Sequence, residues 1–193
     1  MFSFELPNII VDDFDKTNLE LAMVYGLNED RSSTQFSKIS KHYQNAGFNY
    51  PGDVNLLAYK APPDVAEQIL QQLPKTLLDK EIPDIFVAKF SKKNIPDMLL
   101  PHIDFGRRCA IDIFLSPGNE LVLTHFHINE ENEILEVLET STINEYTTIA
   151  LNTRTLHSAT LLNNYCEYFI SISFRKIKYN DLIEHYQIKE LHE

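Results

Sequence analysis

From residue 82 to residue 176 the sequence is a succession of short segments rich in β-branched and aromatic residues, and this pattern limits the possible folds most. Segment 108–115 alternates in polarity and is followed by Ser116-Pro117-Gly118-Asn119, a strong turn signal. Further strands are predicted at 84–91, 120–128, 134–140, 146–152 and 168–176. About seven short strands separated by turns favour a small β-sandwich or jelly roll.

The first 80 residues are predicted to be mostly helical with short extended pieces, and the end of the chain is predicted to be helical. Candidate helices cover 15–27 and 32–46, and the segment Pro62-Pro63-Asp64 begins a third, which Pro74 ends or kinks. A short terminal helix is predicted from Asn180, its expected cap. We therefore expect one mainly β domain with flanking helices (α+β). Its expected parts are a helical N-terminal layer at 1–80, a β core at 82–176 and a C-terminal helix at 177–193.

Composition restricts the expected partners and location. The chain has 17 Lys and Arg against 28 Asp and Glu, a net charge of -11, which opposes a phosphate-binding surface, so no nucleic-acid partner is expected. We expect neither a membrane span nor a secretory signal, because no apolar segment is long enough and the N-terminus lacks a basic region. Cys109 and Cys166 lack metal-ligand spacing and are expected to be reduced, which suits a cytoplasmic protein.

The segment His102-Ile103-Asp104, together with the distant His157, has the residue types of a mononuclear non-haem Fe(II) site. Residues i and i+2 of a strand point to the same side, so His102 and Asp104 can reach one ion, while His157 must come from another strand. Two imidazoles and one carboxylate on one face of an octahedral ion leave the opposite face open for substrates and O2. The alternative, ordinary polar residues at strand ends, stays open.

The segments around these residues resemble 2-oxoglutarate and Fe(II)-dependent oxygenases, in particular the prolyl- and aspartyl-hydroxylase-like proteins of bacteria and phages. Residues 101–115 (PHIDFGRRCAIDIFL) resemble the metal-binding strand of that family. Residues 150–159 resemble its second histidine segment, and 168–175 resemble its closing strand. The resemblance covers roughly residues 84–176.

This resemblance implies a double-stranded β-helix and a hydroxylase that acts on a peptide, an amino acid or another small molecule. The implied cofactor is Fe(II), and the implied co-substrate is 2-oxoglutarate. The implied metal ligands are His102, Asp104 and His157.

One position departs from the family pattern. The family has an Arg about ten residues after the distal histidine, which binds the far carboxylate of 2-oxoglutarate through a guanidinium fork. This chain has Glu167 there, and a carboxylate repels a carboxylate. Glu167 has the parity of Ser171 and Ser173, so all three are expected to face the barrel interior. The use of 2-oxoglutarate is therefore left open.

Other cations could replace this Arg, although each could equally be a solvated surface charge. The residues predicted to bind the co-substrate are Arg108, Arg154, Arg175, Ser171 and Ser173, with Arg107 and Lys89 as weaker choices. The residues predicted to line the pocket are Asp112, Asn152 and Glu167. A buried Asp112 would need a partner, which Arg108 or Arg154 could supply.

Two alternatives from other classes remain. The segment His125-Phe126-His127, followed by Glu130 and Glu131, loosely resembles a cupin metal motif, so the chain could be a cupin-like metalloprotein that does not use 2-oxoglutarate. Glu167 favours the other alternative, a catalytically silent β-helix domain that serves as a binding module.

Replacing any one of His102, Asp104 or His157 by Ala is expected to abolish stoichiometric Fe(II) binding, because each supplies one of the few protein ligands. Anaerobic titration with Fe(II), followed by metal analysis of the desalted protein, measures the stoichiometry. Metal retained by all three variants would contradict the site.

Overall fold

The computed structural model describes residues 2–11, 55–91, 98–104, 106–115, 121–129, 134–144, 147–161 and 168–190. The strands in these ranges are β1 (Ser3–Leu6), β2 (Asn55–Lys60), β3 (Asp84–Ser91), β4 (Met98–His102), β5 (Cys109–Phe114), β6 (Leu121–Asn129), β7 (Ile134–Ile143), β8 (Thr148–Leu151), β9 (Leu156–Leu161) and β10 (Tyr168–Phe174). The helices are α3 (Pro63–Gln72), α4 (Lys75–Leu78) and α5 (Tyr179–Glu190). The helices predicted at 15–27 and 32–46 lie outside the described residues.

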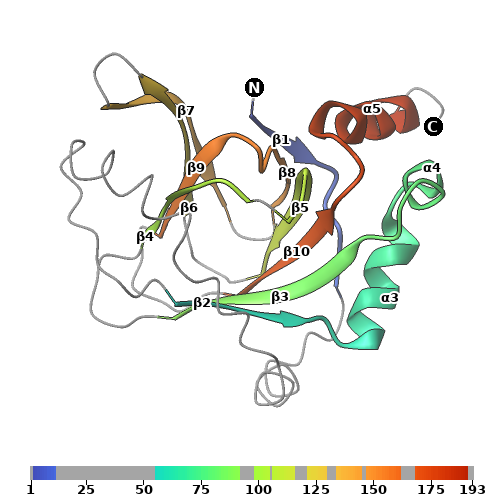
Figure 1. Cartoon of the computed structure of the whole chain (residues 1–193). Coiled ribbons are helices and arrows are strands. Elements are labelled where there is room, and N and C mark those ends of the chain that lie inside the picture. The colour runs from blue at the N-terminus through green and yellow to red at the C-terminus, as the bar shows by residue number, and fades with distance from the viewer. Residues whose placement is uncertain are drawn as a thin grey trace.

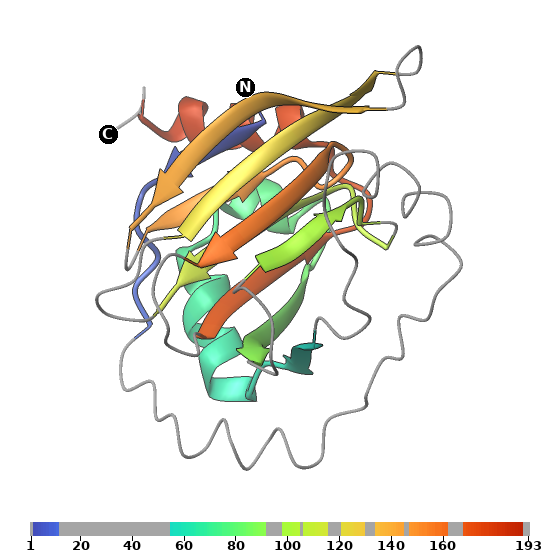
Figure 2. The ribbon, with the colours of Figure 1, turned by 90° about the vertical axis from the view of Figure 1, so that its left-hand side faces the viewer.

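The strands form two antiparallel sheets that face each other (Figure 1 and Figure 2). The larger sheet has six strands in the order β1-β8-β5-β10-β3-β2, and the smaller has four in the order β4-β9-β6-β7. Strands from distant parts of the sequence are therefore neighbours, as in a jelly roll. The predicted fold class, a double-stranded β-helix with flanking helices, is confirmed.

Helices cover the outer face of the six-stranded sheet, on the side away from the four-stranded sheet (Figure 1). In α3, Val65 and Ile69 recur at helical spacing and are buried, and α5 contributes Leu182 and Tyr186 to the same core. The strands supply the other side of this core, including Ile85, Val87, Cys109, Ile111, Ile113, Ile170, Ile172 and Phe174. A second, smaller core lies on the inner face and consists of Leu123, Ile143, Ile149, Leu151 and Ala159.

The limits of α3 agree with the sequence prediction, and the start of α5 does not. α3 begins at Pro63, where proline suits the first helical turn, and it ends before Pro74, after which α4 begins. α5 begins at Tyr179, so Asn180 is the second residue of the helix, and the prediction that it caps the helix was wrong. No helix in the described residues is long and apolar enough to cross a membrane.

Four strands escaped the sequence prediction. β1 and β2 form the two edges of the six-stranded sheet and lie within the first 80 residues, where short extended pieces were expected but not located. β4 contains Pro101, which edge strands tolerate, and it is an edge of the four-stranded sheet. β9 is built around His157-Ser158-Ala159, residues without strong strand preference.

Side chains join one pair of edges between the two sheets. The Ser3 hydroxyl on β1 donates to Glu139 Oε1 on β7 at 3.1 Å, and it lies 3.3 Å from the Ser141 hydroxyl. The Phe2 N–H donates to Glu139 Oε2 at 3.3 Å. These contacts hold the start of the chain against the smaller sheet.

Ile172→Ala is expected to lower the free energy of unfolding by about 2–5 kcal/mol, because Ile172 is completely buried in the core between the six-stranded sheet and the helices. Urea denaturation followed by circular dichroism measures the loss. The matched control is Ile82→Ala, since Ile82 is 77% exposed. Equal losses in the two variants would contradict this description of the core.

Candidate metal centre

Three histidines occupy one level of the four-stranded sheet. In the strand register His102 on β4 lies opposite His157 on β9, and His157 lies opposite His125 on β6. Residues directly opposite each other on antiparallel strands project from the same face, with Cβ atoms about 5 Å apart. We call His102, His157 and His125 the histidine row. The side chains of His125 and His157 are buried, and the side chain of His102 lies outside the described part of the structure.

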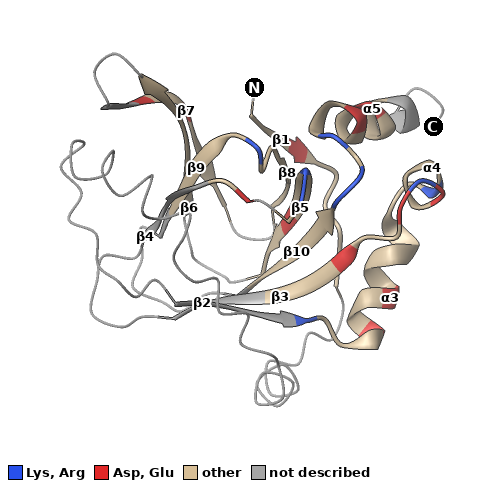
Figure 3. Ribbon diagram, in the orientation of Figure 1, with Lys and Arg blue, Asp and Glu red and all other residues tan. Residues whose placement is uncertain are grey.

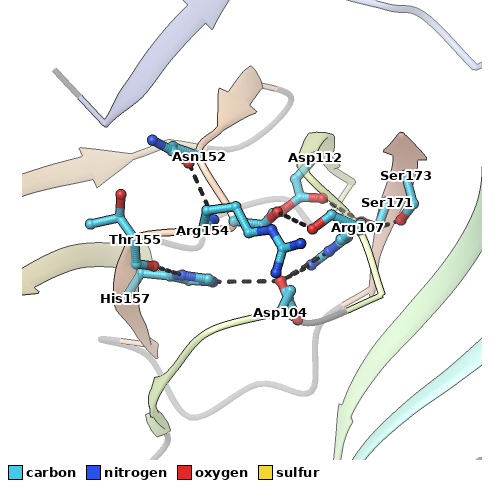
Figure 4. A network of polar contacts seen from close by, with 10 residues as sticks. Asp104, Arg107, Asp112, Asn152, Arg154, Thr155, His157, Ser171 and Ser173 are labelled. Atoms are coloured by element: carbon cyan, nitrogen blue, oxygen red, sulfur yellow. Dashed lines mark hydrogen bonds and ion pairs between the residues drawn. The ribbon is translucent and has the colours of Figure 1, made fainter. Parts of the chain in front are cut away.

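Asp104 joins this row from the loop that follows β4. Its N–H donates to the carbonyl of Thr153 at 3.0 Å, which fixes the loop against the turn between β8 and β9. Its carboxylate is buried, and Oδ2 lies 3.8 Å from Nε2 of His157 (Figure 4). Asp104 and His157, two of the three predicted metal ligands, therefore lie with their potential donor atoms close together.

The turn between β8 and β9 fixes the orientation and tautomer of His157. Asn152 Oδ1 accepts the Arg154 N–H at 3.2 Å, and the Asn152 carbonyl accepts the Thr155 N–H at 3.3 Å. The Thr155 carbonyl lies 2.8 Å from Nδ1 of His157 (Figure 4). A carbonyl only accepts hydrogen bonds, so Nδ1 carries a proton and Nε2 of the neutral ring keeps its lone pair. This is the tautomer that a metal ligand requires.

Arg107 is the cation that reaches this site. Its Nε and Nη2 donate to Asp104 Oδ2 at 2.9 and 2.7 Å, and its Nη1 donates to the hydroxyl of Ser171 and, at 3.2 Å, to that of Ser173 (Figure 4). The side chain is 18% exposed, whereas every other Lys or Arg side chain that the structure describes is exposed. Burial lowers the pKa of Arg107, but the carboxylates of Asp104 and Asp112 outweigh it and raise the pKa.

The network continues to Asp112 on β5. Ser171 accepts from Arg107 and donates its own proton to Asp112 Oδ1 at 2.6 Å. Burial raises the pKa of Asp112, although Arg107 and Ser171 act in the opposite direction. Asp112 thus has the buried position expected of it, but its partners are Ser171 and Arg107 rather than Arg108 or Arg154.

The other predicted cations lie on the surface. Arg108 precedes β5 and is exposed, so the parity of that strand does not extend to it, and Arg154 is exposed as well. Arg175 is 68% exposed and pairs with Asp84 at 2.7 Å. Exposed Lys and Arg residues also lie between β10 and α5 and on α4 (Figure 3).

Several predicted residues have a defined place and two do not. Ser171 and Ser173 are buried in the network, and Asn152 is half-buried in the turn before β9. Glu167 and the side chain of Lys89 lie outside the described residues, so the departure at position 167 stays a prediction. Arg107, a weaker choice in the sequence, stands in a loop, where strand parity gives no direction to a side chain.

The two histidines of the cupin-like motif have different environments. His125 is fully buried, whereas His127 is exposed. Cys109 is a free, buried thiol whose pKa burial raises to about 12, and Cys166 lies outside the described residues. Within the described side chains no group of three His, Cys, Asp or Glu is assembled, so the third ligand is placed by the backbone register of His102 alone.

No protein-family model and no curated protein matches the chain. Its structure is similar to that of Escherichia coli YcfD, with a TM-score of 0.54 and 12% identity over 99% of this chain and 54% of that one. Another YcfD structure, a ribosomal oxygenase in complex with cobalt and succinic acid, has a TM-score of 0.43 and 16% identity over 75% of this chain and 38% of that one. A variant of oxalate decarboxylase from Bacillus subtilis has a TM-score of 0.39 and 10% identity over 66% and 28%.

The chain therefore spans about half of the YcfD chain with the higher TM-score and 28% of the oxalate decarboxylase chain. At these identities the likeness establishes the fold alone. That fold is a jelly roll of the cupin type. The vicilin of Solanum melongena is a further similar structure, with a TM-score of 0.40 and 8% identity over 65% of this chain and 29% of that one.

Asp112→Asn is expected to gain stability relative to the wild-type protein as pH rises. The pKa of Asp112 is raised in the folded protein. The stability that this carboxyl group contributes is therefore fully present below its unfolded-state pKa of about 4, and it is lost as pH rises through its folded-state pKa. The amide keeps an acceptor for Ser171 and carries no charge.

Urea denaturation of both proteins over a series of pH values measures the difference, in which the other titrating groups cancel. Asp79→Asn, on the surface after α4, controls for the loss of one carboxylate. If the difference in the free energy of unfolding between Asp112→Asn and the wild-type protein stays constant with pH, the pKa of Asp112 is not raised.

Proposed function

We propose that this protein is a non-haem Fe(II)-dependent oxygenase whose metal is held by His102, Asp104 and His157. The observation that carries the proposal is the approach of His157 Nε2, in its lone-pair tautomer, to Asp104 Oδ2 at 3.8 Å. His102 lies opposite His157 in the register, which supplies the second imidazole. Two imidazoles and a carboxylate are the donor set of the facial Fe(II) triad.

The surroundings of these residues fit a metal ion. Thr155 orients His157, and Arg107 orients Asp104, which are the outer partners that metal ligands usually have. When bound, the metal supplies O2 activation, and the protein supplies ligand geometry and substrate orientation. The activity expected is hydroxylation, or related C–H oxidation, of a peptide, an amino acid or another small molecule.

Arg107 supports the use of a 2-oxo acid as co-substrate. Among the Lys and Arg side chains that the structure describes, Arg107 alone is partly buried, and the hydroxyls of Ser171 and Ser173 stand beside its guanidinium. A carboxylate of 2-oxoglutarate could be bound there by a charge-assisted pair. Arg107 would then take over the role of the Arg that the family has where this chain has Glu167.

The second candidate is a cupin-like metalloprotein that does not use 2-oxoglutarate. One observation favours it: Arg107 is already bonded to Asp104 and lies close enough to Asp112 for that carboxylate to raise its pKa. One guanidinium facing two carboxylates leaves little attraction for a further dicarboxylate. The two candidates differ in what binds beside the metal.

The access route follows from the placement of the loops. The loop after β4 and the turn before β9 are bonded to each other through Asp104, Arg107 and Thr153. On the inner face beyond the histidine row, the barrel is filled by apolar side chains such as Leu123 and Ala159. We therefore place substrate approach at the end of the barrel that carries these loops, and no nucleic acid is proposed as substrate.

The anaerobic Fe(II) protein is expected to develop a visible charge-transfer band when 2-oxoglutarate is added. Arg107→Gln is expected to weaken 2-oxoglutarate binding at least about tenfold, because a charge-assisted pair is lost. Absorption titration measures the affinity for 2-oxoglutarate. A metal titration of the same variant shows whether the loss of Arg107 also weakens metal binding through Asp104. Arg108→Gln, one residue away and exposed, is the matched control.

Metal binding without a band would overturn the 2-oxoglutarate proposal and favour the cupin-like candidate. If the wild-type protein binds no metal at all, the oxygenase proposal fails and the chain is a binding module. An unchanged affinity in Arg107→Gln would remove Arg107 from the co-substrate site.

A further inference from the structure

β7 is the outermost strand of the four-stranded sheet, and its outer edge has no strand beside it among the described residues (Figure 2, gold). Its ladder runs to β6 alone, and β7 forms no other backbone–backbone hydrogen bond in the described part of the chain. Protected edge strands are commonly short, whereas β7 has ten residues. The N–H and C=O groups along such an edge form a template that a further strand can extend.

The two halves of β7 differ in their surroundings. The second half lies beside the start of the chain, because Phe2 and Ser3 bond to Glu139 and Ser3 also contacts Ser141. The first half extends away from β1 (Figure 1 and Figure 2). The first half is therefore the part of the strand that a partner can reach, and we call residues 134–138 the docking edge.

The docking edge exposes apolar side chains. Val137 is 62% exposed and Leu138 is 48% exposed, and they are neighbours in the chain. Val137 lies opposite Phe126 in the register, and Glu139 lies opposite His125, so Leu138 is the extra residue of a bulge. Adjacent exposed apolar residues on an unpaired edge mark a contact site for another chain.

The charge around the docking edge indicates which kind of chain would pair with it. The sequence has no Lys or Arg between Arg108 and Arg154, and Glu136 lies exposed on the docking edge itself. Pairing with a second copy would bring two acidic edges together, and like charges opposite each other destabilise a strand pair. A basic segment has the complementary charge. The glutamates between the two arginines are Glu120, Glu130, Glu131, Glu133, Glu136, Glu139 and Glu145.

We propose that the docking edge binds an extended basic segment of another protein, which adds a fifth strand to the four-stranded sheet. In this mode of recognition main-chain hydrogen bonds supply affinity, and the side chains of alternate residues supply specificity. Neighbouring residues of a strand point to opposite faces, so Glu136 and Val137 select on opposite faces of the added strand. The segment that fits alternates basic residues, which meet Glu136, with apolar residues, which meet Val137. The inference does not depend on the proposed function, because the docking edge contains none of the candidate metal ligands.

The test measures binding of a fluorescent peptide of alternating lysine and valine to the full chain by fluorescence anisotropy. The same peptide with its backbone nitrogens methylated keeps its side chains and charge but has no N–H group to donate to β7. A peptide of alternating glutamate and valine reverses the charge. We expect the lysine peptide to bind, with an affinity that falls as salt rises, and the other two peptides not to bind.

Val137→Lys is expected to weaken binding of the lysine peptide at least about tenfold, because the variant places a like charge on the docking edge and removes an apolar contact. Ile82→Lys is the matched control, since Ile82 is 77% exposed before β3 and the substitution changes the net charge equally. Its affinity for the lysine peptide is expected to equal that of the wild-type protein.

Hydrogen exchange of the wild-type chain locates the added strand without any variant. The lysine peptide is expected to slow exchange of the amides of residues 134–138. Absence of this protection, equal binding of the methylated peptide, or equal affinity of Val137→Lys and the wild-type protein would overturn the inference. A free protein that dimerises in sedimentation experiments, with the dimer lost in Val137→Lys, would also overturn it, because a second copy would then be the occupant of the docking edge.

Discussion

A partly buried guanidinium holds the candidate site together. Arg107 is bonded to Asp104 in its own loop and to Ser171 and Ser173 on β10, and through Ser171 it is linked to Asp112 on β5. A charge in the barrel interior must be paired, because desolvation of an unpaired ion costs several kcal/mol. These bonds tie Asp104 and Arg107 to β10, and they help to set where the Asp104 carboxylate meets His157.

The same interaction allows the net charge around Arg107 to change. Two buried carboxylates share one guanidinium, and burial raises the pKa of Asp112. A protonated Asp112 leaves Arg107 with Asp104 alone, whereas an ionised Asp112 competes for it. A ligand that carries a carboxylate into this space alters the balance among all three groups. Binding of such a carboxylate ligand would therefore be linked to the charge on Asp112.

Regular strands were the predictable part of this chain. β3, β5, β6 and β10 alternate or are rich in β-formers, and the alternation correctly placed Asp112 inside. Parity failed where the strand ends: Arg108 precedes β5 and is exposed, and the loop turns Arg107 inward instead. No local rule gives the direction of a loop side chain, because direction there depends on the partners that tertiary structure supplies.

The histidine row shows the same limit at longer range. His102, His125 and His157 belong to strands β4, β6 and β9, whose neighbour relations are set by the topology of the sheet. The spacing of His102 and Asp104 suggested a shared ion, but nothing near His125 in the sequence indicated that it stands beside His157. Long-range register is a property of the complete pair of sheets rather than of any one segment.

The order of the strands has a consequence for how the molecule assembles. β9 fills the place between β4 and β6, and β10 fills the place between β5 and β3, although both come last among the strands. Each sheet therefore lacks an inner member until the final third of the chain is available. Such late, distant pairings slow folding. A chain that stops before residue 156 would be left with two incomplete sheets and unpaired inner edges, which invite association with other chains.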